Sequence, residues 1–176
     1  MDEVIQRRVL EKTAPAADML AQVYEQDAAV LKNNFTFEGG SRSDLAGFAN
    51  SKEFVASYPF VGYQFKLLPD VMTEVRKHGV KAKHMSTGER SMLSAFQESA
   101  QVIQHDQTGA LVPFWRFFDT ISKDLEHGIS LVVDRAVRAA ENAEGLEPYD
   151  VQVLKLLYLI RLRQGHGREH LHPYDR

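Results

Sequence analysis

The chain has 176 residues, of which 44% are hydrophobic and 26% are charged, so it is the size of one domain or two very small ones and can bury a core. Its formal net charge of −3 gives no overall attraction to nucleic acid or to a membrane, so any such contact would have to be local. It contains no cysteine, which excludes disulfides and thiolate metal sites and favours a cytoplasmic location.

Apolar residues recur at helical spacing along most of the chain, and no useful length alternates with the period of two that strands show. The sequence therefore predicts an all-α protein, an irregular multi-helix bundle. Thr13 and Pro15 mark a break at which a new helix begins. Ser51 is expected to cap a short helix that stops before Pro59. Pro69 lies in a helical pattern, and it implies a kink or a later helix start.

Three further helices are expected in the second half of the chain. The first carries the apolar stripe Leu93, Phe96, Ala100 and Ile103. The second carries Leu125, Ile129, Val132, Val133, Ala136, Val137 and Ala140. The third begins at Pro148 and is apolar on most faces, which predicts a central position in the fold. Between the first two, "FWRFF" (114–118) could be a base-stacking platform, but the spacing of Phe114, Phe117 and Phe118 favours the core.

The stretch "KHMSTGERSMLSAFQESA", residues 83–100, contains a candidate site at a helix start, formed by Ser86, Gly88, Glu89 and Arg90. Ser86 and Glu89 have the capping-box spacing, in which each side chain accepts a hydrogen bond from the other residue's backbone N–H. The carboxylate would occupy the place of a bound phosphate, so local physics favours a cap over an anion site. Arg90 remains available to reach a phosphate that a partner supplies.

The segment "RKHGVKAKH", residues 76–84, is the main concentration of basic residues before the C-terminal tail. The candidate contacts to phosphate or nucleic acid are Arg76, Lys77, Lys81, Lys83 and Arg90. The other interpretation is a solvated helix end, whose cations suit the negative end of the helix dipole. Because no aromatic residues are interleaved, the segment favours this second interpretation.

Histidines gather in the C-terminal "GHGREHLH", at His166, His170 and His172. Their spacing is not that of His-Glu-x-x-His, and Gly165 and Gly167 disfavour a helix, so we expect no metal site. The chain also lacks a Gly-x-x-x-x-Gly-Lys-Ser/Thr loop and a Gly-x-Ser-x-Gly elbow. We therefore expect no catalytic residues and no cofactor in this chain, which is not a complete enzyme.

Four blocks follow one another in the order of a known family: "YPFVGYQFKLL", "KHMSTGERSMLSAFQESA", "LVPFWRFFDTI" and "DVQVLKLLYLIR". Over residues 2–161 the chain resembles the large P-loop ATPase of BREX phage-defence systems and of phage-growth-limitation systems. The resemblance implies an AAA+-type ATPase that acts in defence against phage DNA. This chain would be an internal fragment that follows the Walker motifs, so ATP and magnesium would belong only to the full-length family.

The last residues, 162–176, change abruptly in composition. Suppose that the gene once continued after Arg161 as the family does, with the protein sequence Tyr-Val-Lys-Asp-Met-Ala-Ala-Asn-Ile-Cys-Thr-Leu-Thr-Thr. Codons for this sequence can be chosen with the following property. A single cytosine inserted after the Arg161 codon converts those codons to the observed sequence from Leu162 to Asp175. We therefore expect a helical domain at residues 1–161 and an out-of-frame ending at 162–176, with only the first helix of a truncated winged helix remaining.

Two functions follow from these observations. The first is a helical, non-catalytic fragment of a BREX-type P-loop ATPase that serves as a lid or as a contact region for partner subunits or DNA. The alternative is a stand-alone nucleic-acid-binding module that uses residues 76–90. The expected partners are other regions or subunits of a BREX-type complex, and DNA, without a membrane. Truncation would leave apolar faces of residues 151–160 unpacked, so we also expect self-association through this helix.

Overall fold

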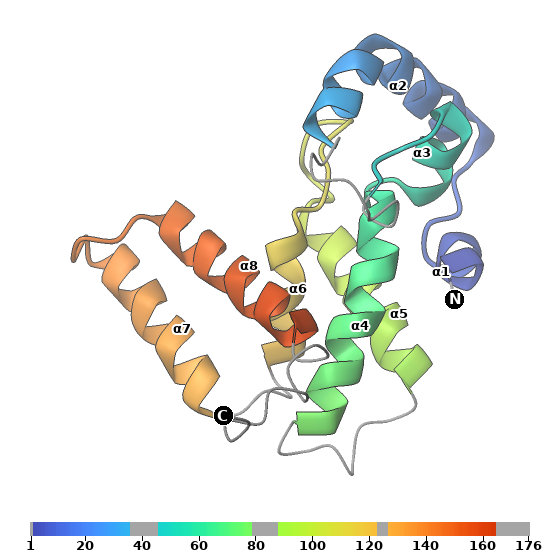
Figure 1. Cartoon of the computed structure of the whole chain (residues 1–176). Helices are drawn as coiled ribbons and strands as arrows, with labels where there is room; N and C mark the ends of the chain where they lie inside the picture. Colours follow the sequence, from blue (N-terminus) through green and yellow to red (C-terminus); the bar gives the residue numbers. More distant parts are fainter. Residues whose placement is uncertain (1, 36–45, 79–87, 123–126, 165–176) are drawn as a thin grey trace, which may run out of the picture. The chain divides into compact units, whose positions relative to one another are not determined.

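A computed structural model describes residues 2–35, 46–78, 88–122 and 127–164 of the chain (Figure 1). All regular secondary structure in these four ranges is helical, which confirms the predicted all-α class. The helices, in chain order, are α1 (Asp2–Arg8), α2 (Ala14–Asn34), α3 (Ser51–Ser57), α4 (Gly62–His78), α5 (Gly88–Val102), the 3₁₀ helix η2 (Phe114–Arg116), α6 (Phe117–Ile121), α7 (His127–Glu141) and α8 (Pro148–Gln164).

The chain divides into two compact units, each built from two separate segments. The first unit comprises Met1–Leu68 and Met92–Pro113, and the second comprises Pro69–Ser91 and Phe114–Arg176. Helices α4 and α5 each contribute residues to both units. Helix α8 continues through residues 162–164, whereas residues 165–176 of the expected out-of-frame ending lie outside the described part.

Aromatic rings form the core of the first unit. Phe54 is 1% exposed and packs edge-on against Phe48, with 4.9 Å between the ring centroids. Phe96 is fully buried and stacks on Phe65 at 4.8 Å, while Phe60 meets it edge-on at 4.7 Å. Such offset and edge-on pairs stabilise a fold by about 0.5–1.5 kcal/mol beyond the burial of their surface. The prediction that Phe96 belongs to a buried helix face is thus confirmed.

A buried glutamine joins the two segments of the first unit. Gln64 is fully buried, and its side-chain amide donates a hydrogen bond of 2.7 Å to the carbonyl oxygen of Val112. Its side-chain oxygen accepts one of 3.2 Å from the backbone N–H of Val61. Both ends of the amide therefore have partners, as a buried polar group requires.

The predicted starts of the helices hold at Thr13 and at Pro148 but fail at Ser51. Helix α2 begins after Thr13 with Pro15 in its first turn, as predicted. The prediction that Ser51 caps α3 is wrong, because the cap is Asn50, whose side-chain oxygen accepts from the backbone N–H of Glu53 at 2.9 Å. Both residue types are good caps, and only the backbone conformation decides between neighbours.

Helix α4 runs from Gly62 to His78 without a break at Pro69, so the alternative of a later helix start is wrong. A proline has no N–H to donate. The carbonyl of Phe65, which lies four residues before Pro69, therefore lacks its usual helical hydrogen bond. The Thr73 hydroxyl donates to the Pro69 carbonyl at 2.8 Å. Packing of the apolar residues Leu68, Val71 and Met72, all buried, outweighs the local cost of the proline.

In the second unit, η2 and α6 pack against α8. Phe114, Phe117, Phe118 and Ile121 are all at most 5% exposed, which confirms that the phenylalanines of "FWRFF" belong to the core. Phe118 lies 6.2 Å from the ring of Tyr158 in α8. Helices α7 and α8 lie side by side as an antiparallel hairpin (Figure 1).

Polar side chains lie close to Trp115 where η2 meets α8. The guanidinium of Arg116 lies 4.2 Å from the indole centroid, and the Lys155 ammonium lies 5.4 Å from it. Lys155 also forms an ion pair of 2.5 Å with Asp119. Because Lys155 of α8 lies near the indole, the tryptophan contributes to the contact between η2 and α8.

Candidate functional site

The structure places only part of the predicted site at the start of α5. The helix begins at Gly88, and the side chain of Arg90 is exposed, as the prediction required. Ser86 and the side chain of Glu89 lie outside the described part, so the capping box between them stays a prediction.

The basic candidates are likewise only partly placed. Arg76, in α4, is half-buried, and its Nε donates a hydrogen bond of 3.2 Å to the carbonyl oxygen of Met72. Lys77 belongs to α4, but its side chain lies outside the described part, as do Lys81 and Lys83 entirely. Of the five candidate cations, Arg90 is therefore the one that the structure shows exposed.

The tail histidines His166, His170 and His172 also lie outside the described residues. Within the part of the chain that the structure describes, no group of three His, Asp or Glu side chains could hold a metal ion. None of the described helices is both long enough and apolar enough to cross a membrane.

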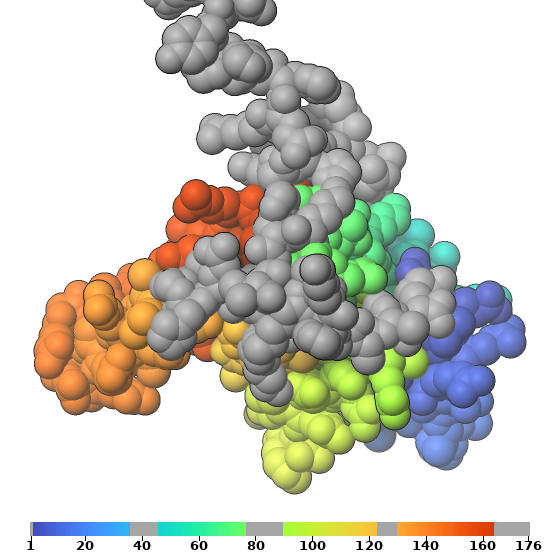
Figure 2. Space-filling view, turned by 90° about the horizontal axis from the view of Figure 1, so that it is seen from below, coloured from blue at the N-terminus to red at the C-terminus, as the bar shows by residue number. Residues whose placement is uncertain are grey.

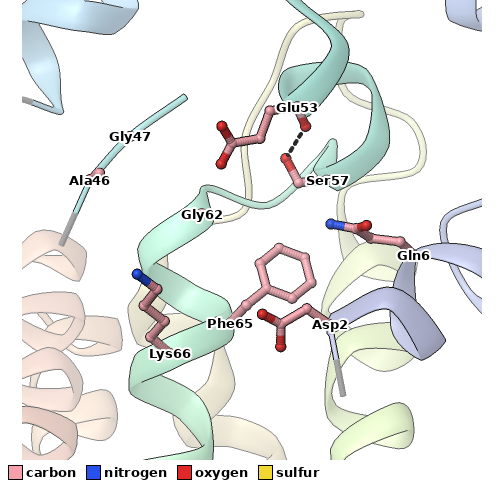
Figure 3. Close-up of a pocket in the computed structure, with 9 residues that line it drawn as sticks. All are labelled: Asp2, Gln6, Ala46, Gly47, Glu53, Ser57, Gly62, Phe65 and Lys66. Carbon is pink, nitrogen blue, oxygen red and sulfur yellow. Dashed lines mark hydrogen bonds between the residues drawn. The ribbon is translucent and has the colours of Figure 1, made fainter. Parts of the chain in front are cut away.

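A small cavity lies in the first unit, between α1, α3 and the first turn of α4 (Figure 3). Its volume is about 120 Å³, and Phe65 forms an apolar wall. Polar side chains line it: Asp2, Gln6, Glu53, Ser57 and Lys66. Gly62 keeps the backbone close, since a Cβ atom there would lie 2.9 Å from the Gly47 carbonyl oxygen and 3.2 Å from Glu53 Oε1.

The polar groups best fixed in this cavity already have structural roles. Glu53 Oε2 accepts a hydrogen bond of 2.9 Å from the backbone N–H of Ala49, which closes the N-terminus of α3. The Ser57 hydroxyl donates to the Glu53 carbonyl oxygen at 2.7 Å (Figure 3). Asp2 and Lys66 are exposed at the rim. Helix capping thus accounts for the Glu53 and Ser57 side chains, and we assign no ligand to this cavity.

Lys12 is a half-buried cation that the sequence did not reveal. Its ammonium donates to the carbonyl oxygens of Tyr58 at 2.6 Å and Ala56 at 3.4 Å, at the C-terminal end of α3. Burial lowers the pKa of Lys12 from 10.5 to about 8. Carbonyls at a helix end attract a cation. The residue therefore joins the connection between α1 and α2 to the end of α3, and its protonation responds to mildly alkaline pH.

Helix α8 carries an apolar stripe formed by Tyr149, Val153, Leu157 and Ile160. At about 100° per residue, these four positions fall within an arc of about 80° on one side of the helix. Tyr149 is 70% exposed, Leu157 57% and Ile160 37%. Val151 and Leu159, on another side of the helix, are buried. Helix α8 is thus apolar on two sides, and the side that carries the stripe is the more exposed of the two.

The prediction that α8 is central holds for its packing, since η2, α6 and α7 all pack against it, but not for the burial of all its sides. The sequence correctly showed an apolar surface nearly all round the helix, but only Val151 and Leu159 fall below one-tenth exposure. Periodicity reports which sides are apolar, not which sides have a neighbour. Val132 of α7, which was expected to face the core, is 44% exposed as well. The space-filling view shows α7 and α8 next to each other (Figure 2).

Comparison with known proteins adds no assignment. No protein-family model matches the chain. No solved structure matches it either.

Proposed function

We propose that the chain is a helical, non-catalytic module that contacts a protein partner through the stripe on α8. The resemblance to the BREX-type P-loop ATPase supplies the setting, in which the partner is another region or subunit of the same ATPase complex. The observation that carries the proposal is the exposure of Tyr149, Leu157 and Ile160 on one side of a helix. In this setting, ATP and magnesium belong to the full-length ATPase rather than to this chain.

The physical argument concerns the pattern of exposure rather than single residues. Isolated apolar side chains are common on protein surfaces and need no explanation. Four aligned apolar positions along three helical turns form the kind of stripe that docks into a groove or pairs with another helix. Burial of one such side chain contributes roughly 1.5–3 kcal/mol, so several must be buried together to offset the cost of association.

The proposal can be tested with a purified BREX-type P-loop ATPase as the probe. We expect the chain to bind it, and Leu157→Gln to weaken binding, because glutamine keeps the length and helical preference of leucine but removes its apolar end. Val30→Gln in α2 is a matched control, since Val30 is also 57% exposed but lies in the first unit. Absence of binding, or equal weakening by both substitutions, would contradict the proposal.

A further inference from the structure

We infer that the stripe on α8 binds the same stripe on a second copy of this chain, in an antiparallel arrangement about a twofold axis. This inference rests on the proposed function, because it concerns the same surface and specifies a second copy of this chain as the subunit that occupies it. It adds the identity of the partner, the direction of the two helices and a specific pair of charges.

The register follows from the spacing of the stripe. Tyr149 and Ile160 mark its ends, about 16 Å apart along the helix axis at 1.5 Å per residue. In an antiparallel pair, Val153 of one copy faces Leu157 of the second copy, and this register also brings Tyr149 close to Ile160. Each aromatic or large aliphatic end therefore meets an apolar partner, and none of the four positions is left facing solvent alone.

Charge complementarity selects a second copy and this orientation. Asp150 lies in the first turn of α8 and Arg161 in its last turn. Both are exposed, and at about 100° per residue both flank the same edge of the stripe. Residues on the same edge face each other in antiparallel helices, so Asp150 of each copy approaches Arg161 of the other. A twofold axis forms this pair twice.

The other two cations on α8 are already engaged within the unit. Lys155 pairs with Asp119, and Nε of Arg163 lies 3.3 Å from a carboxylate oxygen of Asp70. Within the described residues, Arg161 forms no ion pair. Asp150 Oδ2 accepts a hydrogen bond of 2.8 Å from the Glu147 backbone N–H, which holds the carboxylate at the start of α8. The two ends of the stripe thus carry charges of opposite sign, Asp150 at one end and Arg161 at the other, as pairing with a second copy requires.

The first experiment is sedimentation equilibrium of the full chain from low micromolar to near-millimolar concentration. A single pair of helices is a small interface, so we expect a dimer with a dissociation constant on the order of 10 μM. Leu157→Gln occurs twice in a symmetric dimer and should weaken it at least about tenfold. Val30→Gln should leave the dissociation constant unchanged. A chain that stays monomeric throughout would overturn the inference.

Charge exchange tests the pairing itself. Arg161→Glu should weaken the dimer about threefold or more, because it places two carboxylates together at each end. Adding Asp150→Lys to the same chain should restore the affinity by reversing the pair. A purely structural role of Asp150 would give no restoration, and this result would overturn the proposed pairing.

The orientation can be read from engineered disulfides, since the natural chain has no cysteine. Under mild oxidation, a Tyr149→Cys/Ile160→Cys double variant should give a covalent dimer, whereas Tyr149→Cys alone should not. A covalent dimer from the single variant would show parallel helices and overturn the antiparallel arrangement.

Failure of this inference is distinguishable from failure of the proposed function. A monomeric chain that still binds the ATPase in a manner weakened by Leu157→Gln would overturn the second copy as the partner and leave the protein-contact function standing. A monomeric chain that also fails to bind the ATPase would overturn both.

Discussion

The Lys12 ammonium makes the stability of the first unit depend on pH in a predictable direction. Its pKa falls from 10.5 to about 8 in the folded chain, because burial disfavours the charged form. Between these two values the unfolded chain binds more protons than the folded chain. The free energy of unfolding should therefore rise as the pH increases from about 8 to about 10.5, and this gain should be absent when Lys12 is replaced by methionine.

The size of this effect can be bounded. The full pKa difference, from 10.5 to about 8, corresponds to at most about 3 kcal/mol. The ammonium is only partly buried, so solvent screens it, and the carbonyls of Ala56 and Tyr58 favour its charged form. We therefore expect about 1–2 kcal/mol across the window. At neutral pH, Lys12→Met removes both hydrogen bonds but also relieves the burial of a charge, and these two effects oppose each other. The unfolding free energies of the natural chain and of Lys12→Met should therefore differ less at neutral pH.

The assay is urea denaturation of the natural chain and of Lys12→Met, followed by far-ultraviolet circular dichroism at several pH values. The quantity of interest is the difference in unfolding free energy between the two proteins, because tyrosine titration near pH 10 is common to both and largely cancels. Lys52→Met in α3 is a control, since Lys52 is exposed. A difference that stays constant or falls between about pH 8 and pH 10.5 would refute the reasoning.

Three further predictions concern the core, a helix cap and the basic candidate. Phe96→Ala should lower the free energy of unfolding by about 3–5 kcal/mol in denaturant titrations, because the ring is fully buried between two others, whereas Gln97→Ala at an exposed position should change it little. Asn50→Ala should cost about 1 kcal/mol in the same assay, and Asn50→Ser should recover most of it; equal losses would argue against a capping role. In a fluorescence titration across a salt series we expect no salt-sensitive binding to double-stranded DNA, and such binding, if weakened by Arg90→Ala, would favour the nucleic-acid alternative.

The helical class could be predicted from the sequence because helical periodicity is a local signal. The positions of α5, α7 and α8 agree with the predicted ones to within a few residues. The buried side of α5 was only partly predicted: Phe96 is buried, but its buried neighbours are Met92, Ala95 and Ser99 rather than Leu93. Leu93 lies about 100° from Met92, so a small rotation of the helix decides between them.

The candidate sites were harder to predict because they depend on contacts between distant residues. Lys12 meets Tyr58 across a separation of 46 residues, and no local pattern announces this contact. The open side of α8 is likewise a property of the packed unit. In contrast, the capping residue of α3 was missed by a single position, because Asn50 and Ser51 both suit a cap and the sequence does not disclose the backbone angles.

The hydrogen bond between Gln64 and Val112 has a consequence for biosynthesis. The first unit is completed only by the segment Met92–Pro113, which supplies Phe96 and Val112 to its core. A growing chain that has reached Leu68 holds most of this unit but lacks the part that closes it. On the ribosome, Phe60 and Phe65 therefore lack their partner Phe96 until the segment that ends at Pro113 has emerged, and this interval is where a chaperone would be needed most.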